Sequence, residues 1–274
     1  MPRRTRTAAG LSSAVRATLY LLLLARTLQK LLEPRPRHYE VKLTPIERAN
    51  EVKPEDILKQ MGCVYTGHFV GVSTKHLAGY CNIDPLMPHV REVGELMKVL
   101  VSHFSDENVE VVASPAVGAI PFAHWGAQHL MEGTRKDILG VWADKVSGAS
   151  QREFVFEREG FAKAVGGKRV LILEDMVNQM ASVKAMIKTV REAGGTVVGV
   201  GCVAANKGAT AEELDVPKFV KLTSVEYEVW TAEECAANGL CAKSEPIVTD
   251  IGHGDDFQAA HPDYAGGYVK LLED

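Results

Sequence analysis

Two adjacent carboxylates, Glu174 and Asp175, are the residues of this chain best suited to chemistry. They follow the apolar run 170–173 and precede the loop "MVNQMAS", 176–182. Two carboxylates held side by side suit a sugar diol or a hydrated magnesium ion, because both ligands need oxygen acceptors in fixed positions. The pair therefore indicates a polar ligand site at the end of a buried strand.

The loop leads into a predicted amphipathic helix. Apolar residues recur at helical spacing from Val183 to Val190, and two glycines, Gly194 and Gly195, follow the helix. We expect Ser182 to be its N-cap. The backbone N–H groups at the helix start, with the positive end of its dipole, are then directed at an anion in the loop. The alternative is a capped core helix beside two solvated acids, and spacing alone does not separate the two.

Strands and helices alternate around this unit. Apolar runs predict strands at 109–114, 137–143, 170–173, 196–200 and 218–230, and helical periodicity predicts helices at 53–62, 88–104, 119–131 and 182–193. Residues 67–84 read as strand, loop and strand, and 144–168 as a polar stretch with little periodicity. This order implies a largely parallel sheet with helices on both faces, in which ligands collect at the carboxyl ends of the strands.

Length and charge limit the classes of protein that fit. A chain of 274 residues, 46% hydrophobic, buries one large core or two modest ones. Residues 1–37 carry eight Lys/Arg and one acid, while the whole chain has net charge −4, so the remainder is strongly acidic. An acidic body argues against broad nucleic-acid binding. We divide the chain into a basic and apolar N-terminal extension, 1–37, and a single domain, 38–274.

The N-terminus and the cysteines bear on the compartment. The apolar run 17–25 ends at Arg26 without a clear cleavage site, and it is shorter than the roughly 20 residues that span a bilayer. A signal peptide or anchor, a dispensable extension and an upstream start codon remain open. The five cysteines are odd in number and scattered, which does not resemble a disulfide framework. We expect a cytoplasmic protein, with membrane association through 17–25 as the alternative.

Four segments resemble one family. Residues 170–182 resemble the phosphoribosyl pyrophosphate loop of type I phosphoribosyltransferases, in which a strand leads into two acids and a TTGGS-like turn. "GHFVGVSTKHLAGYCNID" (67–84) and "SPAVGAIPFAHWGA" (114–127) resemble segments of orotate phosphoribosyltransferases, and 227–247 is similar to a cysteine-bearing C-terminal element in one branch. The resemblance covers roughly 54–254. It implies an α/β fold of the type I phosphoribosyltransferase kind, a mostly parallel twisted sheet flanked by helices with a small N-terminal substrate-loop hood.

The resemblance implies an activity and a role for each segment. The family transfers ribose 5-phosphate from phosphoribosyl pyrophosphate to N1 of orotate, giving orotidine 5′-monophosphate and pyrophosphate in pyrimidine biosynthesis. Glu174 and Asp175 are then expected at the ribose hydroxyls. The 5′-phosphate is expected among Asn178, Gln179, Met180, Ala181 and Ser182, the pyrophosphate against Ala116, Val117, Gly118 and Ala119, and orotate against Ser73, Lys75, Tyr80 and Asn82. Mg²⁺ is expected to bind through the substrate pyrophosphate, with Asp175 as its candidate protein ligand.

The family also implies a homodimer. One subunit donates a basic loop that closes over the pyrophosphate of the other, and the polar stretch after Ala143 occupies the place of that loop. Lys145 is the candidate catalytic cation, with Arg152 and Arg158 as helpers. The alternative is a solvated surface loop.

The chain departs from the family pattern at the site. Residues 178–181 replace the TTGG of the loop, and Thr74, Ser114 and Ala119 replace glycines elsewhere. A side chain in a left-handed conformation costs roughly 1–2 kcal/mol, and Met180 fills space near the phosphate. Two hypotheses follow, an active orotate phosphoribosyltransferase and a non-catalytic or weakly active homologue that binds a nucleotide or phosphoribosyl ligand. Transfer to another base is a third, disfavoured by the orotate-type order of the substrate loop.

Two further patterns are weaker. "GVGCVA" (199–204) suggests a dinucleotide fingerprint but lies within a predicted strand, so we reject that interpretation. A zinc site drawn from the C-terminal cysteines and histidines matches no standard ligand spacing, and a polar loop explains the same residues. The residues considered for it are Cys235, Cys241, His253 and His261. His68, His76 and His124 are interpreted as loop or core histidines.

Overall fold

The computed structural model describes residues 53–71, 74–149, 152–178, 180–206 and 208–272. The extension 1–37 and its apolar run lie outside the described residues. Helix α2 (Pro54–Gln60) opens the described part, with Pro54 in its first turn and Gly62 in the left-handed conformation after its end, as the sequence predicts. In the part of the chain that the structure describes, no helix combines the length and the apolar character needed to cross a membrane.

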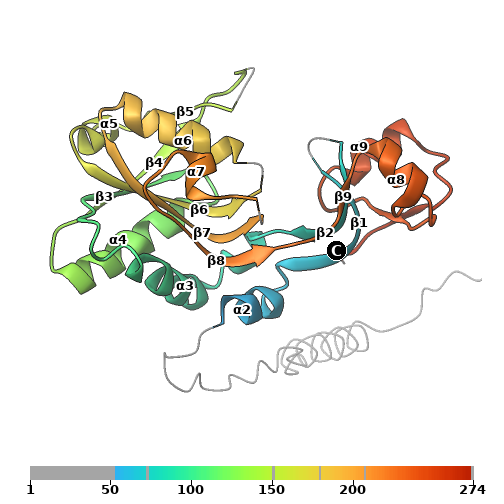
Figure 1. Ribbon diagram of the computed structural model, residues 1–274, viewed down its shortest axis with the longest axis horizontal. Helices are drawn as coiled ribbons and strands as arrows, with labels where there is room; N and C mark the ends of the chain where they lie inside the picture. The colour runs from blue at the N-terminus through green and yellow to red at the C-terminus, as the bar shows by residue number, and fades with distance from the viewer. Residues whose placement is uncertain (1–52, 72–73, 150–151, 179, 207, 273–274) are drawn as a thin grey trace, which may run out of the picture. The chain divides into compact units, whose positions relative to one another are not determined.

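A six-stranded sheet forms the centre of the α/β core (Figure 1). Its order is β5-β4-β3-β6-β7-β8, and every neighbouring pair is parallel except β4 and β5. The strands are β3 (Val111–Pro115), β4 (Leu139–Lys145), β5 (Phe154–Val155), β6 (Arg169–Val177), β7 (Thr196–Asn206) and β8 (Phe219–Val225). The expected largely parallel sheet is therefore confirmed.

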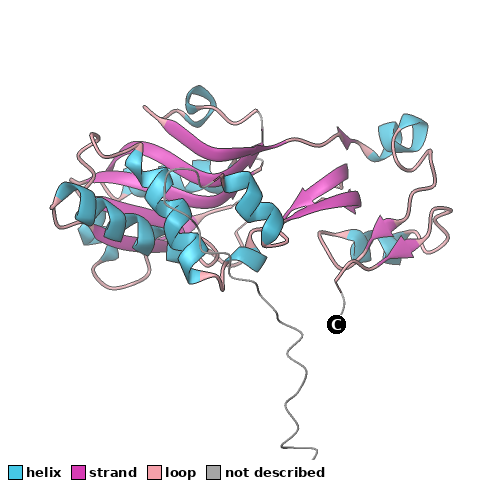
Figure 2. Ribbon diagram, turned by 90° about the horizontal axis from the view of Figure 1, so that it is seen from below, coloured by secondary structure: helices cyan, strands magenta, loops and turns pink. Residues whose placement is uncertain are grey.

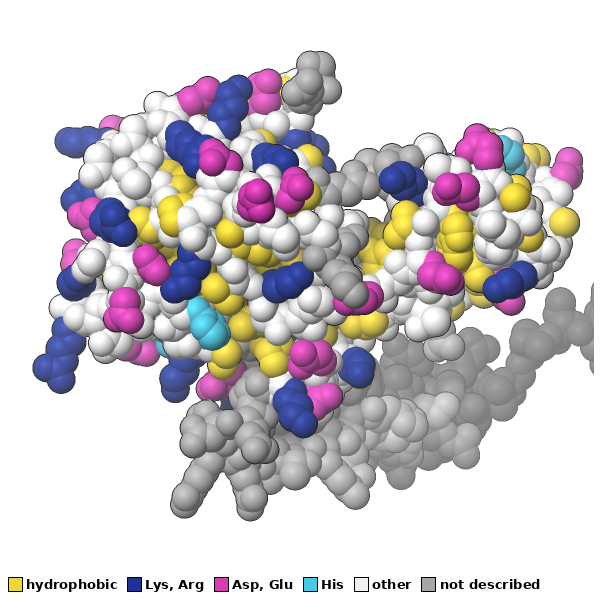
Figure 3. Space-filling view, viewed as in Figure 1, with side chains coloured by type: hydrophobic (Ala, Val, Ile, Leu, Met, Phe, Trp, Pro, Cys, Tyr) yellow, Lys and Arg dark blue, Asp and Glu magenta, His cyan; other side chains and the backbone are white. Residues whose placement is uncertain are grey.

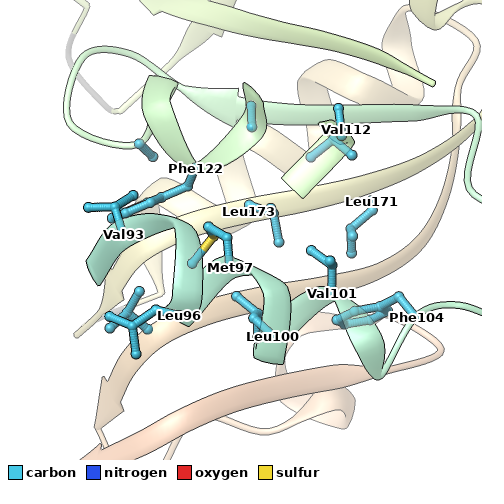
Figure 4. Close-up of a cluster of buried hydrophobic side chains, with 14 of the residues drawn as sticks. Val93, Leu96, Met97, Leu100, Val101, Phe104, Val112, Phe122, Leu171 and Leu173 are labelled. Carbon is cyan, nitrogen blue, oxygen red and sulfur yellow. The ribbon is translucent and has the colours of Figure 1, made fainter. Parts of the chain in front are cut away.

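Helices cover both faces of this sheet (Figures 1 and 2). One face carries α3 (Val90–Ser102) and α4 (Ile120–Thr134), and the other carries α5 (Phe161–Val165), α6 (Ala181–Glu192) and α7 (Ala211–Leu214). Successive residues of β6 point to opposite faces, so Leu171 and Leu173 pack with α3 and α4 while Val170 and Ile172 pack with α6. Figure 4 shows the first of these clusters.

Two glycines of α4 differ in their surroundings. A Cβ on Gly126 would lie 2.4 Å from Leu173 Cδ1, so the absence of a side chain lets α4 approach β6 closely. A Cβ on Gly133 would meet no atom within 4 Å. Gly126 is thus a packing requirement, and Gly133 is not.

A second, five-stranded sheet contains the N-terminal hairpin and C-terminal strands. Its order is β11-β10-β1-β2-β9. The strands are β1 (Val64–Val70), β2 (His76–Cys81), β9 (Val229–Trp230), β10 (Ile247–Val248) and β11 (Tyr268–Val269), with α8 (Ala232–Asn238) and α9 (Gly254–Ala260) among them. The expected hood therefore exists, but residues from both ends of the described chain build it. We call this sheet and its two helices the hood.

Three expectations about elements need correction. Residues 218–230 do not form one strand: β8 ends at Val225 and joins the large sheet, whereas β9 pairs with β2 in the hood. Further strands follow β9, so 218–230 does not hold the last one. Within 144–168, where the sequence predicts no element, β5 pairs with the end of β4 and α5 follows.

On the face seen in Figure 3, basic and acidic side chains are interspersed rather than separated by sign. That face therefore offers no continuous basic surface for a nucleic acid.

Candidate functional site

The acid pair lies at the carboxyl end of β6, as predicted. Glu174 is 5% exposed, and Asp175 is half-buried. The Asp175 N–H donates to Glu174 Oε1 at 3.2 Å, while Glu174 Oε2 is buried and has no hydrogen-bond partner among the described residues. Burial, and then the negative charge of Asp175, raise the pKa of Glu174 well above its usual range. A buried oxygen without a partner is unfavourable unless a ligand supplies one.

A cavity of about 250 Å³ opens beside these acids. It brings together side chains from three strand ends and from the start of α6. Its lining consists of Pro115, Ala116, Gly118, Ala119, Lys145, Arg152, Phe154, Glu174, Asp175, Met176 and Ser182. Two cationic side chains, two carboxylates and a backbone loop thus share one small space, which suits a ligand that carries both hydroxyl and phosphate groups.

The loop after β3 lies directly over the acid pair. A Cβ on Gly118 would come within 3.2 Å of Asp175 Oδ2, so glycine permits this close approach. The peptide between Ala116 and Val117 is cis, and the Val117 side chain is 80% exposed. Of the four residues expected at the pyrophosphate, Ala116, Gly118 and Ala119 line the small cavity.

A second cavity, of about 570 Å³, is lined by the connection between β6 and α6 and by residues of the hood. Its lining consists of Gly71, Lys75, Leu77, Tyr80, Arg152, Met176, Val177, Asn178, Met180, Ala181, Ser182, Val183, Tyr227 and Val229. Arg152, Met176 and Ser182 line both cavities, so the two are adjacent. The structure thereby places the β1–β2 hairpin next to the residues 176–182.

The start of α6 differs from the expectation. The helix begins at Ala181, and its N-cap residue is Met180, with φ 58° and no side-chain cap hydrogen bond. Ser182 is therefore not the N-cap. Its hydroxyl instead accepts a hydrogen bond from the Arg152 guanidinium. Residues of the first helical turn, from Ala181 onward, still line the cavities.

Met180 and Thr74 both stand where the family has glycine, and both keep a left-handed backbone with φ 58°. The expectation that a side chain is forced into this conformation is thus confirmed at these two positions. It is wrong at the other three, because Ser114 lies in β3, Ala119 has φ −88° and Ala181 is the first residue of α6. The Met180 side chain also lines the larger cavity.

Two predicted site residues, Arg158 and Asn82, make other contacts. Arg158 lies over the Trp142 ring, 6.0 Å from its centroid, with its Nε 4.0 Å from Asp144 Oδ2. Asn82 Oδ1 accepts a hydrogen bond from the Asp84 N–H at 3.1 Å. Neither is among the residues that line the two cavities. Ser73 and Gln179 lie outside the described residues.

Sequence reasoning did not select Tyr227 as a site residue. Tyr227 lines the larger cavity with Tyr80, and a Cβ on Gly79 would lie 3.2 Å from it. The sequence predicts one strand over 218–230 and so hides its position, because Tyr227 lies just after the end of β8, at the carboxyl edge of the parallel sheet. Phe154 in the small cavity carried no signal either, because the stretch around it lacks periodicity.

A parallel α/β sheet with an acid pair, cationic side chains and a helix start at its carboxyl edge defines an enzyme class that handles phosphorylated sugars or nucleotides. Residues 79–237 match the model of the phosphoribosyl transferase domain, which is more than half of the chain. The chain belongs to the phosphoribosyltransferase family.

Several relatives carry a more specific name. The chain is 28% identical over 192 residues to the orotate phosphoribosyltransferase of Chlorobium phaeobacteroides, covering 70% of this chain and 91% of the relative. It is 29% identical over 192 residues to that of Caldicellulosiruptor bescii, covering 70% and 92%. The crystal structure of orotate phosphoribosyltransferase from Aeropyrum pernix is 19% identical, covers 62% of this chain and 92% of its own, and gives a TM-score of 0.49.

Proposed function

We propose that this protein is an orotate phosphoribosyltransferase, which transfers ribose 5-phosphate from phosphoribosyl pyrophosphate to orotate. The observation that carries the proposal is the pair of adjacent cavities. One holds Glu174, Asp175, Lys145 and the loop 116–119, and the other holds Lys75 and Tyr80. The names of the relatives support orotate as the acceptor.

The small cavity is proposed for the phosphoribosyl group and its pyrophosphate. In the reaction, the bond between N1 of orotate and C1′ forms while the bond from C1′ to pyrophosphate breaks, and pyrophosphate leaves with the electron pair. The N1 proton is released. Glu174 and Asp175 would accept hydrogen bonds from the ribose hydroxyls, and Lys145 and Arg152 would balance the charge that develops on pyrophosphate. Such catalysis is positioning and electrostatics without a covalent intermediate.

The phosphate cradle is proposed at the start of α6. Its backbone N–H groups, the Ser182 hydroxyl and Arg152 supply donors that suit a 5′-phosphate. Asn178 lines the larger cavity at the same loop and adds an amide donor. The turn thus retains several anion-binding groups although its glycines are absent.

The larger cavity is proposed for orotate. Tyr80 offers a flat ring for stacking, and Lys75 offers a positive charge to the orotate carboxylate. Tyr227 forms a second aromatic wall. We also propose that Ser73 and Asn82, which lie near Lys75 and Tyr80 in the sequence, contact orotate.

Mg²⁺ fits the residues at the small cavity. The unpartnered Glu174 Oε2 and the adjacent Asp175 carboxylate are the hard oxygen donors that this ion prefers. When bound, Mg²⁺ would neutralise charge on the pyrophosphate. Asp175 is the proposed protein ligand.

The proposal extends to assembly and compartment. We propose a homodimer in a reducing cytoplasm, and the free thiols of all five cysteines agree with reducing conditions. Lys145 and Arg152 line a cavity of their own chain, so we propose that each subunit supplies these two basic side chains to its own site.

The activity test follows orotate absorbance while the purified protein is incubated with Mg²⁺, phosphoribosyl pyrophosphate and orotate. We expect a steady loss of absorbance and release of pyrophosphate. A thermal shift by phosphoribosyl pyrophosphate without turnover would identify a non-catalytic homologue. The absence of both turnover and a thermal shift would contradict the proposed function.

A further inference from the structure

Four nitrogen and sulfur side chains converge inside the hood, away from both cavities. They are His68 on β1, His76 on β2, Cys235 on α8 and Cys241 just after α8, and their ligand atoms all lie within 4.8 Å of one another. The first three are buried, and Cys241 is half-buried. The proposed phosphoribosyl transfer uses none of them.

Their spacing matches a single tetrahedral ion. The Cys235 and Cys241 sulfurs lie 3.7 and 3.8 Å from His68 Nε2, and the Cys241 sulfur lies 3.4 Å from His76 Nδ1. Bonds of about 2.3 Å to sulfur and about 2.0 Å to nitrogen give tetrahedron edges of roughly 3.3–3.8 Å. The pair His68 Nε2 and His76 Nδ1, at 2.7 Å, is closer than such an edge, and rotating one imidazole ring opens it.

The surroundings hold two of these ligands in position. His68 Nδ1 lies 3.1 Å from the backbone carbonyl of Glu245, so an Nδ1–H donated there leaves the Nε2 lone pair facing the cluster. The same carbonyl accepts a hydrogen bond from the Tyr264 hydroxyl at 2.8 Å. On the cysteine side, the Cys241 N–H donates to the Cys235 sulfur at 3.3 Å. Such outer contacts are typical of ligands that serve a metal.

Gly239 gives independent evidence of a turn built around a sulfur. A Cβ at this position would lie 2.9 Å from Cys235 Sγ and 2.8 Å from Cys235 Cα. Since its φ is −92°, the requirement for glycine comes from space rather than from a left-handed backbone. The chain folds closely over the thiol, and this fold also brings the Cys241 sulfur to the cluster.

We propose that His68, His76, Cys235 and Cys241 bind one structural Zn²⁺ in the hood. Two thiolates and two neutral imidazoles balance the charge of the ion, so the buried site is neutral overall. Soft sulfur ligands together with imidazoles select zinc over the hard, oxygen-binding ions magnesium and calcium. Four protein ligands complete the coordination, as in closed structural sites.

The topology shows what the ion would join. Residue pairing places His76 opposite Trp230 of β9 and His68 opposite Ile247 of β10. Cys235 and Cys241 lie in the excursion between these two short strands. The ion would therefore fix that excursion to the β1–β2 hairpin, whose loop carries Lys75. Of the four residues considered for zinc in the sequence analysis, the proposal keeps Cys235 and Cys241. His253 instead pairs with Asp256, and His261 Nδ1 lies 3.2 Å from the Phe257 carbonyl.

The first test measures zinc in the untagged full-length protein after expression in zinc-supplemented medium and extensive desalting. We expect about one zinc per chain by mass spectrometry of the metal. Cys235→Ser and His76→Asn should lose it. Matched controls are Cys63→Ser, a buried thiol outside the cluster, and His253→Asn, an exposed histidine of the hood. Both controls should retain the zinc.

The second test does not depend on whether the variants fold. Wild-type protein is depleted with a chelator and refilled with Co²⁺, for which we expect the intense visible bands of tetrahedral cobalt and a near-ultraviolet thiolate-to-cobalt band. A wild-type protein with only trace zinc and without these bands would overturn the proposal. So would a Cys235–Cys241 disulfide in protein purified without oxidant. Since zinc and cobalt are read directly, loss of orotate turnover leaves this test unaffected.

Discussion

At the scale of single residues, the backbone of Met180 makes a sharp prediction about stability. The left-handed φ of 58° destabilises the folded state by about 1–2 kcal/mol when the residue is not glycine. Glycine avoids this strain, but its larger backbone entropy in the unfolded chain lowers the free energy of unfolding by about 0.4–1 kcal/mol. Met180→Gly should therefore raise the free energy of unfolding by up to about 1 kcal/mol. Urea denaturation measures this change.

Ala181→Gly is the matched control for Met180→Gly. Ala181 is the first residue of α6, so glycine there should lower the free energy of unfolding by a few tenths to about 1 kcal/mol. Met180→Gly should also tighten phosphoribosyl pyrophosphate binding, because Met180 is the residue before α6, in the turn proposed for the 5′-phosphate, and glycine removes its side chain from that turn. If Met180→Gly and Ala181→Gly lowered the free energy of unfolding equally, the backbone of Met180 would not be strained.

Asp175 carries the second residue-scale prediction. Asp175→Asn keeps the size of the side chain but removes a charge and one strong acceptor beside Gly118. We expect turnover to fall by at least about 100-fold with the fold retained, as is usual when a charge-stabilising group is lost. Circular dichroism checks the fold, and Asp106→Asn, an exposed acid after α3, is the control. Turnover near the wild-type rate would place the ribose elsewhere.

At the scale of elements, the contact of α4 with β6 predicts opposite effects for two glycine substitutions. Gly126→Ala places a methyl group 2.4 Å from Leu173, and overpacking of this kind destabilises by about 1–3 kcal/mol. Gly133→Ala on the same helix meets no atom within 4 Å and should stabilise by up to about 1 kcal/mol through helix propensity. Thermal denaturation compares the two, and destabilisation by both would contradict the packing argument.

The elements also show what the sequence allows one to predict. The stripe of α3 follows from helical periodicity, because the helix packs on one core cluster. The strands β3 and β6 are read from continuous apolar runs, because both of their faces are buried. The division of 218–230 does not follow from such local patterns, since β9 is defined by its partner β2 far earlier in the chain. Ser182 is of a residue type that often caps helices, yet the observed N-cap is the left-handed Met180, two residues earlier, and α6 begins at Ala181.

The acid pair and the proposed zinc ligands also differ in how far the sequence predicts them. Glu174 and Asp175 are adjacent in sequence, so one strand end suffices to predict the acid pair. The four metal ligands come from two widely separated regions, and no local spacing unites His68 with Cys235, which are 167 positions apart. Only the pairing of β1 with β10 and of β2 with β9 brings them together.

At the scale of the whole molecule, a mixing experiment tests whether each subunit of the proposed dimer has a complete site. Lys145 and Asp175 line the same cavity of one chain. We therefore expect Lys145→Ala and Asp175→Asn to be inactive separately and to recover no activity when co-expressed. Light scattering checks that mixed dimers form. Recovery would show that the basic side chain comes from the partner subunit.

The pairing within the hood also has a consequence for biosynthesis on the ribosome. His68 and Glu245, whose contact helps close the hood, are 177 positions apart. The α/β core lies between them, and domains generally fold as units while synthesis proceeds. The core can therefore fold before β9 and β10, the partner strands of the β1–β2 hairpin, have been synthesised. Chains that stop before residue 229 should yield a folded core with an unfinished substrate pocket, so completion of synthesis itself is the step that permits binding.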